Sequence, residues 1–188
     1  MRRCAEPYAK QRDAAVRELA EAAGVKVASP VSHTLYDPGQ LLARAGGRAP
    51  LTMQSFLKLV AALGDPPAPA PDPPARLPGP APGTKGAEEG ATGIPSLAAL
   101  GYTEAPTSPF KGGEAAALAR MADCLADKDW VARFEKPRGN PAALLRPATT
   151  VLSPHLKFGS LSARLLHAKL LEIYAERPKH TQPPVSLR

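Results

Sequence analysis

A proline-rich stretch near the middle of the chain limits the fold more than any other feature. Nine of the 17 residues from Pro66 to Pro82 are proline, and half of the others are alanine. Proline lacks the N–H donor that helices and sheets need, so the stretch is typical of a polyproline-like linker without a packed core. We expect the lack of fixed structure to continue to about Gly93. The alternative interpretation is a ligand for an aromatic groove on a partner protein.

The residues before this linker are predicted to form two helices and a strand. Apolar side chains recur at helical spacing in residues 9–23 and 53–63, and Thr52 and Gly64 are placed to cap the second helix. The sequence VKVAS, residues 25–29, is typical of a short strand. The apolar helix positions are Val16, Leu19, Ala20, Ala23, Met53, Phe56, Leu57 and Val60. This order predicts the closing part of an α/β domain whose first strands are absent.

The part that follows the linker is predicted to be all-α. Nothing between Gly112 and Arg188 alternates apolar and polar residues as a strand does. One helix is expected around residues 117–125 and another over residues 162–174, with Trp130 in the core. The apolar helix positions are Ala117, Leu118, Met121, Leu125, Leu166, Leu170, Ile173 and Tyr174.

The positive charge of the chain is concentrated at its C-terminal end. Residues 130–188 hold 10 Lys and Arg against 3 Asp and Glu, whereas residues 1–129 hold 14 of each kind. The whole net charge of +7 therefore lies in the last third. A basic region of this kind attracts phosphates of nucleic acid or of a nucleotide cofactor, and a solubilising surface is the equal alternative.

The cysteines and the apolar runs exclude several classes of protein. Cys4 and Cys124 are the two cysteines, and they form neither a metal-ligand pair nor a disulfide framework, which favours a reducing compartment. No apolar run approaches the roughly 20 residues of a transmembrane helix, and the first residues lack the core of a signal peptide. We expect a soluble intracellular protein.

The sequence TTVLSPHLKFG, residues 149–159, is the strongest candidate for a binding site. Ser153 before Pro154 is a typical helix start, with the serine as N-cap, and Gly159 ends that short helix before Ser162 caps the next. Free N–H groups at a helix start favour anions, and Thr149 and Thr150 add hydroxyl donors. Lys136 and Arg138 supply positive charge nearby in the sequence. Plain helix capping remains the alternative.

The segment TTVLSPHLKFGSLSARLL resembles the flavin-diphosphate segment of the photolyase/cryptochrome family. Other segments that resemble the family follow in its order: EPYAKQRD, VSHTLYDPG, PLTMQSFLKLV, FKGGEAAALARM, WVARFEKPR and KHTQPPVSLR. The sequence pattern FEKPR…TTVLSPHLKFGSLSARL…QPPVSL is most similar to that of (6-4) photolyases and animal-type cryptochromes. The resemblance covers nearly the whole chain except the proline-rich stretch.

The resemblance implies an α+β, multidomain organisation. Residues 1–64 would be the remnant of an α/β, Rossmann-like photolyase domain, which in relatives carries an antenna chromophore such as a deazaflavin or methenyltetrahydrofolate. Residues 65–111 would be the disordered insertion and interdomain linker. Residues 112–188 would be the first part of the all-α FAD-binding domain.

The resemblance also assigns candidate site residues. It implies that Lys136 lies near the flavin and the phosphate of damaged DNA, and that Phe134 stands close to an aromatic position beside the cofactor. No residue is assigned to catalysis or to a metal, and none of the four histidines is given a catalytic role. The residues implied to cradle the FAD diphosphate are Thr149, Thr150, Val151, Leu152 and Ser153.

In function, the resemblance implies a FAD-dependent, blue-light-driven lyase that repairs UV-induced (6-4) pyrimidine photoproducts in DNA. The segment that faces the flavin ring in relatives would follow Arg188, so we expect this chain to be an inactive internal fragment of a longer, monomeric protein, in the nucleus or an organelle. A FAD-binding blue-light photoreceptor that acts through a signalling partner is the alternative. A chain without flavin that acts through its linker or basic surface is a third.

Overall fold

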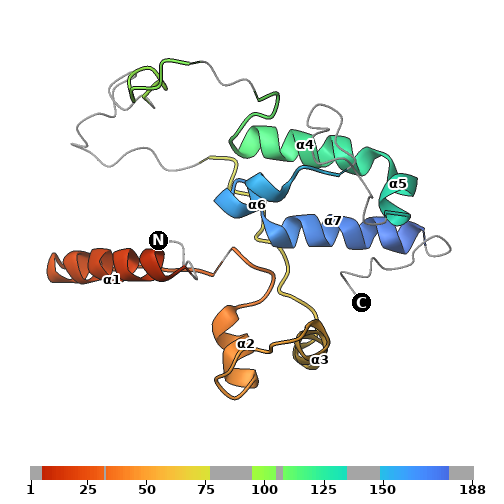
Figure 1. Cartoon of the computed structure of the whole chain (residues 1–188), viewed down its shortest axis with the longest axis horizontal. Helices are drawn as coiled ribbons and strands as arrows, with labels where there is room; N and C mark the ends of the chain where they lie inside the picture. The colour runs from red at the N-terminus through yellow and green to blue at the C-terminus, as the bar shows by residue number, and fades with distance from the viewer. Residues whose placement is uncertain (1–5, 32, 77–94, 105–107, 135–148, 178–188) are drawn as a thin grey trace. The chain divides into compact units, whose positions relative to one another are not determined.

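The computed structural model describes residues 6–31, 33–76, 95–104, 108–134 and 149–177. Within these ranges the chain forms seven helices and no strand (Figure 1). It divides into two compact units, one of residues 1–69 and 112–188 and the other of residues 70–111. No helix in the described ranges is both long enough and apolar enough to cross a membrane.

The first helix, α1 (Pro7–Ala22), forms where it was predicted, but its apolar face is not buried. Val16 is 47% exposed and Leu19 is 73% exposed, whereas Ala9 and Asp13 are buried. The Asp13 carboxylate accepts a hydrogen bond of 2.8 Å from Arg12. Apolar residues at helical spacing lose contact with water only where another element covers them, and the described residues contain no sheet that could cover this face.

The predicted strand at residues 25–29 is wrong for this structure. These residues have no regular secondary structure, and the described part of the chain offers no second strand with which they could pair. The predicted α/β character of residues 1–64 therefore rests on the sequence alone. The proline-rich residues 66–76 also form neither helix nor strand, and the rest of the predicted linker up to Gly93 lies mostly outside the described residues.

Helices α2 (Pro38–Arg44) and α3 (Met53–Leu63) pack against each other. The predicted caps of α3 are confirmed: the Thr52 hydroxyl accepts from the Ser55 backbone N–H at 3.2 Å, and Gly64 follows the last helical residue with a φ of 78°. The Tyr36 hydroxyl donates to the Gly64 carbonyl oxygen at 2.7 Å, which ties the loop before α2 to the end of α3. Burial raises the pKa of this tyrosine.

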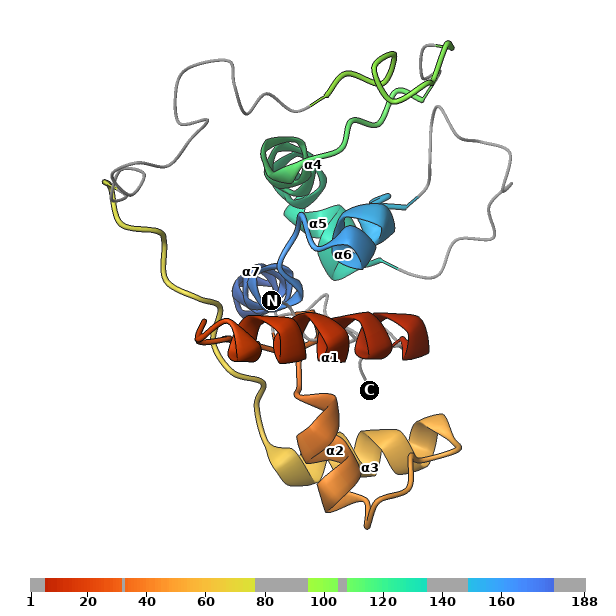
Figure 2. The same cartoon turned by 90° about the vertical axis from the view of Figure 1, so that its left-hand side faces the viewer.

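The C-terminal part is all-α in the residues described, as the sequence predicts. Its helices are α4 (Glu114–Ala126), α5 (Lys128–Ala132), α6 (Ser153–Phe158) and α7 (Ala163–Glu176), and they lie together in both views (Figures 1 and 2). Ala117 and Met121 of α4 form the core with Leu152 and Leu161. The predicted apolar side of α4 is buried except at Leu118 and the partly buried Leu125.

The expectation that Trp130 is a core residue is wrong. Its side chain is 37% exposed and meets Phe134 edge to face, with ring centroids 5.0 Å apart. The core position on α5 belongs to its neighbour Val131, which is 4% exposed and lies on the helix that packs against α7. A helix of five residues can turn only part of its surface inward, so burying Val131 leaves Trp130 at the edge.

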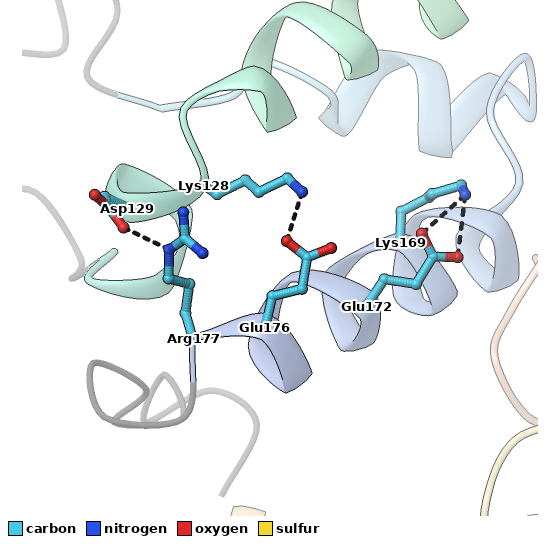
Figure 3. Close-up of polar contacts among 6 residues, drawn as sticks. All are labelled: Lys128, Asp129, Lys169, Glu172, Glu176 and Arg177. Atoms are coloured by element: carbon cyan, nitrogen blue, oxygen red, sulfur yellow. Dashed lines mark hydrogen bonds and ion pairs between the residues drawn. The ribbon is translucent and has the colours of Figure 1, made fainter.

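Two ion pairs join α5 to the C-terminal end of α7 (Figure 3). Lys128 Nζ lies 2.5 Å from Glu176 Oε2, and Arg177 Nε lies 2.8 Å from Asp129 Oδ1. A third pair, Lys169 with Glu172, lies within α7. Ile173 of α7 and Val131 and Ala132 of α5 are buried, so apolar packing also stabilises these two helices, which are in contact.

Candidate functional site

The segment Thr149–Ser153 leads into α6, and its helix start differs from the prediction. Leu152, not Ser153, occupies the N-cap position, and no side chain caps the helix. The Leu152 carbonyl oxygen accepts from the Leu156 N–H at 3.0 Å. Leu152 is 2% exposed in the core, so tertiary packing fixes it at the boundary and moves Ser153 into the first turn. The predicted helix end at Gly159, with a φ of 69°, is confirmed.

The backbone bends sharply at Val151. Its φ of 55° lies in the left-handed region, and Val151 is the sole non-glycine residue with positive φ in the described ranges. A β-branched residue rarely adopts this conformation, which costs about 1–3 kcal/mol and is maintained only where surrounding contacts enforce it. The strain therefore falls in the middle of the predicted diphosphate segment.

Two side chains of α4 hold the backbone just before this bend. Arg120 Nε donates to the Thr150 carbonyl oxygen at 2.9 Å, and Cys124 Sγ lies 3.5 Å from the same oxygen. Burial raises the pKa of the Cys124 thiol, against the smaller opposing effect of the Arg120 charge, so the thiol keeps its proton and donates weakly. The site therefore depends on α4 as well as on the segment itself.

The sequence did not identify Arg120 and Cys124 as site residues. Both are polar residues next to the apolar face of a predicted helix, and they are four positions apart, so they share one side of that helix. This spacing was the available signal. The spacing does not show that both side chains contact Thr150, nor that the contacted atom is its carbonyl oxygen.

The segment carries three residues with hydroxyl groups. Thr149 and Ser153 are exposed, and Thr150 is partly buried. Hydroxyl donors beside a helix start, in a segment whose Thr150 carbonyl oxygen binds the Arg120 guanidinium, fit the donor set that a diphosphate requires. Lys136, the remaining predicted cofactor and DNA residue, lies outside the described residues.

His155 has structural surroundings. His155 is buried, its Nδ1 lies 3.1 Å from Ser160 Oγ, and its carbonyl oxygen accepts from the Leu161 N–H at 3.1 Å. These contacts close the end of α6. Over the described residues, no group of three or more acidic, histidine or cysteine side chains is placed to hold a metal ion.

Comparison with known proteins relates both halves of the chain to one family. The family model described as DNA photolyase matches residues 1–74. A (6-4)DNA photolyase of Oryza sativa subsp. japonica is 49% identical over 185 residues, covering 97% of this chain and 32% of the relative. The chain belongs to the photolyase/cryptochrome family.

Other relatives from the same family match over a similar length. A (6-4)DNA photolyase of Arabidopsis thaliana is 44% identical, covering 97% of this chain and 33% of the relative. Cryptochrome-1 of Gallus gallus is 40% identical, with 97% and 30% covered. The chain thus spans about a third of the length of these photolyases and cryptochromes.

Proposed function

We propose that this chain contributes to a FAD-dependent, blue-light-driven photolyase that repairs UV-induced (6-4) pyrimidine photoproducts in DNA. One observation carries the choice within the family. The two relatives named (6-4)DNA photolyase are 49% and 44% identical to the chain, whereas the relatives named Cryptochrome-1 are 39% to 41% identical over the same share of it.

We assign the FAD diphosphate to the segment from Thr149 to Ser153. The exposure of Thr149 and Ser153, the bend at Val151 and the burial of Leu152 support this assignment, because together they describe an anchored segment with hydroxyl donors on exposed residues. FAD, when bound, supplies the light-driven electron donation on which the family's repair depends. Lys136 is proposed as a contact to the cofactor and the DNA phosphate. This assignment rests only on the resemblance of the segment FEKPR to the photolyase/cryptochrome family.

Damaged DNA is the proposed macromolecular partner. The net charge of +7 in residues 130–188 suits contacts to the phosphate backbone. A photoproduct must leave the base stack to reach a buried cofactor, so these contacts would have to hold the duplex while the lesion is flipped out. An antenna chromophore, a deazaflavin or methenyltetrahydrofolate, is proposed for the region that matches the DNA photolyase family model.

The second candidate is a blue-light photoreceptor that binds FAD and signals without repairing DNA. The matches to Cryptochrome-1 at about 40% identity favour it over any function outside the family. It shares the flavin site with the photolyase, so FAD binding alone does not separate the two candidates. Photoreversal of a lesion does.

A chimera tests the proposal. The chain replaces the matching third of the rice (6-4)DNA photolyase, and the product is assayed for bound FAD and for blue-light reversal of a (6-4) photoproduct in a defined oligonucleotide. We expect both. FAD without reversal would favour the photoreceptor, and a folded chimera without FAD would rule out the flavin site. The chimera with Thr149→Ala and Thr150→Ala is the matched variant.

A further inference from the structure

The carbonyl group of Thr150 is the point at which α4 holds the proposed diphosphate segment. It accepts from Arg120 Nε at 2.9 Å and faces Cys124 Sγ at 3.5 Å. A hydrogen bond from a charged guanidinium is the stronger of the two, because the charge assists it and a thiol is a weak donor. Arg120 therefore provides most of the attachment.

The next residue along the chain, Val151, is the strained one. Its φ of 55° is unfavourable for a β-branched side chain. It lies between two anchored neighbours, since the Thr150 carbonyl is bonded to α4 on one side and Leu152 is buried in the core on the other. Releasing either neighbour would let Val151 return to an ordinary negative φ.

We propose that Arg120 is a positioning residue that holds the bend at Val151, and through it the segment that cradles the FAD diphosphate. The link between Arg120 and the FAD diphosphate rests on the proposed function. Arg120 acts through the Thr150 backbone, so its effect on a ligand would be indirect. Lysine could replace it only in part, since its single ammonium group lacks the fixed planar geometry of the guanidinium.

The bond itself is tested in the unmodified 188-residue chain by NMR. The Arg120 Nε–H should exchange with solvent more slowly than that of Arg48, an exposed loop residue. Exchange at the Arg48 rate would overturn the proposal without any substitution, so the test does not depend on a variant that folds.

The consequence of the bond is tested with Arg120→Met, which keeps most of the apolar stem and removes the donors. The intraresidue HN–Hα distance of Val151, which is short at positive φ, should lengthen. Alkylation of Cys124, measured in a Cys4→Ser background, should become several-fold faster. We expect Arg120→Lys to give intermediate values and Arg48→Met to give wild-type values. A folded Arg120→Met chain with an unchanged bend and alkylation rate would overturn the proposal.

A rescue variant separates the bend from general damage to packing. Asparagine adopts positive φ more readily than valine does. Adding Val151→Asn to Arg120→Met should therefore restore the short HN–Hα distance of residue 151. General damage to packing at α4 would not allow this restoration. A double variant that stays unbent would contradict the proposed link between Arg120 and Val151.

Ligand titration distinguishes this inference from the proposed function. FAD and inorganic pyrophosphate are added at millimolar concentration while the amide signals of residues 149–153 are followed. We expect Arg120→Met to need at least tenfold more of either ligand. If the wild-type signals respond to neither and the folded chimera also carries no FAD, the flavin assignment fails, whereas the exchange rate and the bend still decide the role of Arg120.

Discussion

Arg177 at the end of α7 donates from Nε to the Asp129 carboxylate of α5 at 2.8 Å, 48 residues earlier in the chain. The neighbouring residues Lys128 and Glu176 repeat the pairing at 2.5 Å, so two adjacent pairs join the same two helices (Figure 3). The pairs lie at the surface, where water and salt weaken them. They therefore add to the apolar contacts of Val131 and Ile173 without replacing them.

Removing one of these pairs should destabilise the fold slightly. Asp129→Asn should lower the free energy of unfolding by about 0.2–1 kcal/mol, the range for exposed ion pairs. Urea denaturation at low and high salt measures it, and the difference from wild type should shrink at high salt. Glu172→Gln removes a pair within α7 and serves as the matched control for one that joins two helices. An equal loss in both variants would show that joining the helices adds nothing.

The Glu176 pair should make stability depend on pH in the acid range. The hydrogen bond and the charge of Lys128 lower the pKa of Glu176. A depressed folded-state pKa stabilises the fold above the unfolded value of about 4.3, and this contribution is lost as the pH falls through the folded-state pKa. Thermal melts from pH 7 down to pH 3 should therefore show a smaller decline for Glu176→Gln than for wild type. Parallel curves would argue against the pair in solution.

The bend at Val151 predicts a stabilising substitution. Val151→Asn should raise the free energy of unfolding by up to about 1 kcal/mol, because asparagine tolerates positive φ and relieves part of the strain. Val151→Thr keeps the β-branched shape and should give no gain. Denaturant unfolding of the three chains measures both values, and a threonine variant as stable as the asparagine variant would refute strain as the cause.

Replacing the hydroxyls should separate ligand binding from stability. Ser153 is not the N-cap, so Ser153→Ala should change the free energy of unfolding by less than about 0.5 kcal/mol. Thr149→Ala with Thr150→Ala should lower FAD affinity tenfold or more per lost contact. Flavin titration of the folded chimera, with circular dichroism as the control, tests this. Unchanged FAD affinity in a well-folded variant would show that residues 149–153 have only a local structural role.

The chain alone should differ from the chimera. We expect it to retain FAD weakly or not at all through purification and to repair no lesion, since the chain spans about a third of its relatives' length and the flavin pocket is expected to need the whole helical domain. Limited proteolysis should cut first between residues 66 and 93, because the sequence predicts no regular structure there. A yellow purified chain, or protection of that segment equal to that of residues 114–134, would contradict these expectations.

The sequence by itself determined the helices and several of their ends. The extents of α3 and α7 and the caps at Thr52 and Ser162 follow from contacts between residues a few positions apart, which any local stretch carries with it. The C-terminal positions Ala117, Met121 and Ile173 were also predicted to be buried, because apolar periodicity indicates which side of a helix faces a core.

Only the tertiary structure decided how the candidate site is built. Ser153 has the stronger capping preference, but burial of Leu152 sets the helix start. The positive φ of Val151 runs against its local preference and is held by Arg120, a residue 30 positions from Thr150, whose carbonyl it bonds. The apolar face of α1 was also predicted from the sequence, but it is exposed, since periodicity identifies an apolar face and not whether another element covers it. Contacts between distant residues outweigh local preferences here, because burying one leucine or satisfying one carbonyl contributes as much free energy as a cap or a preferred φ.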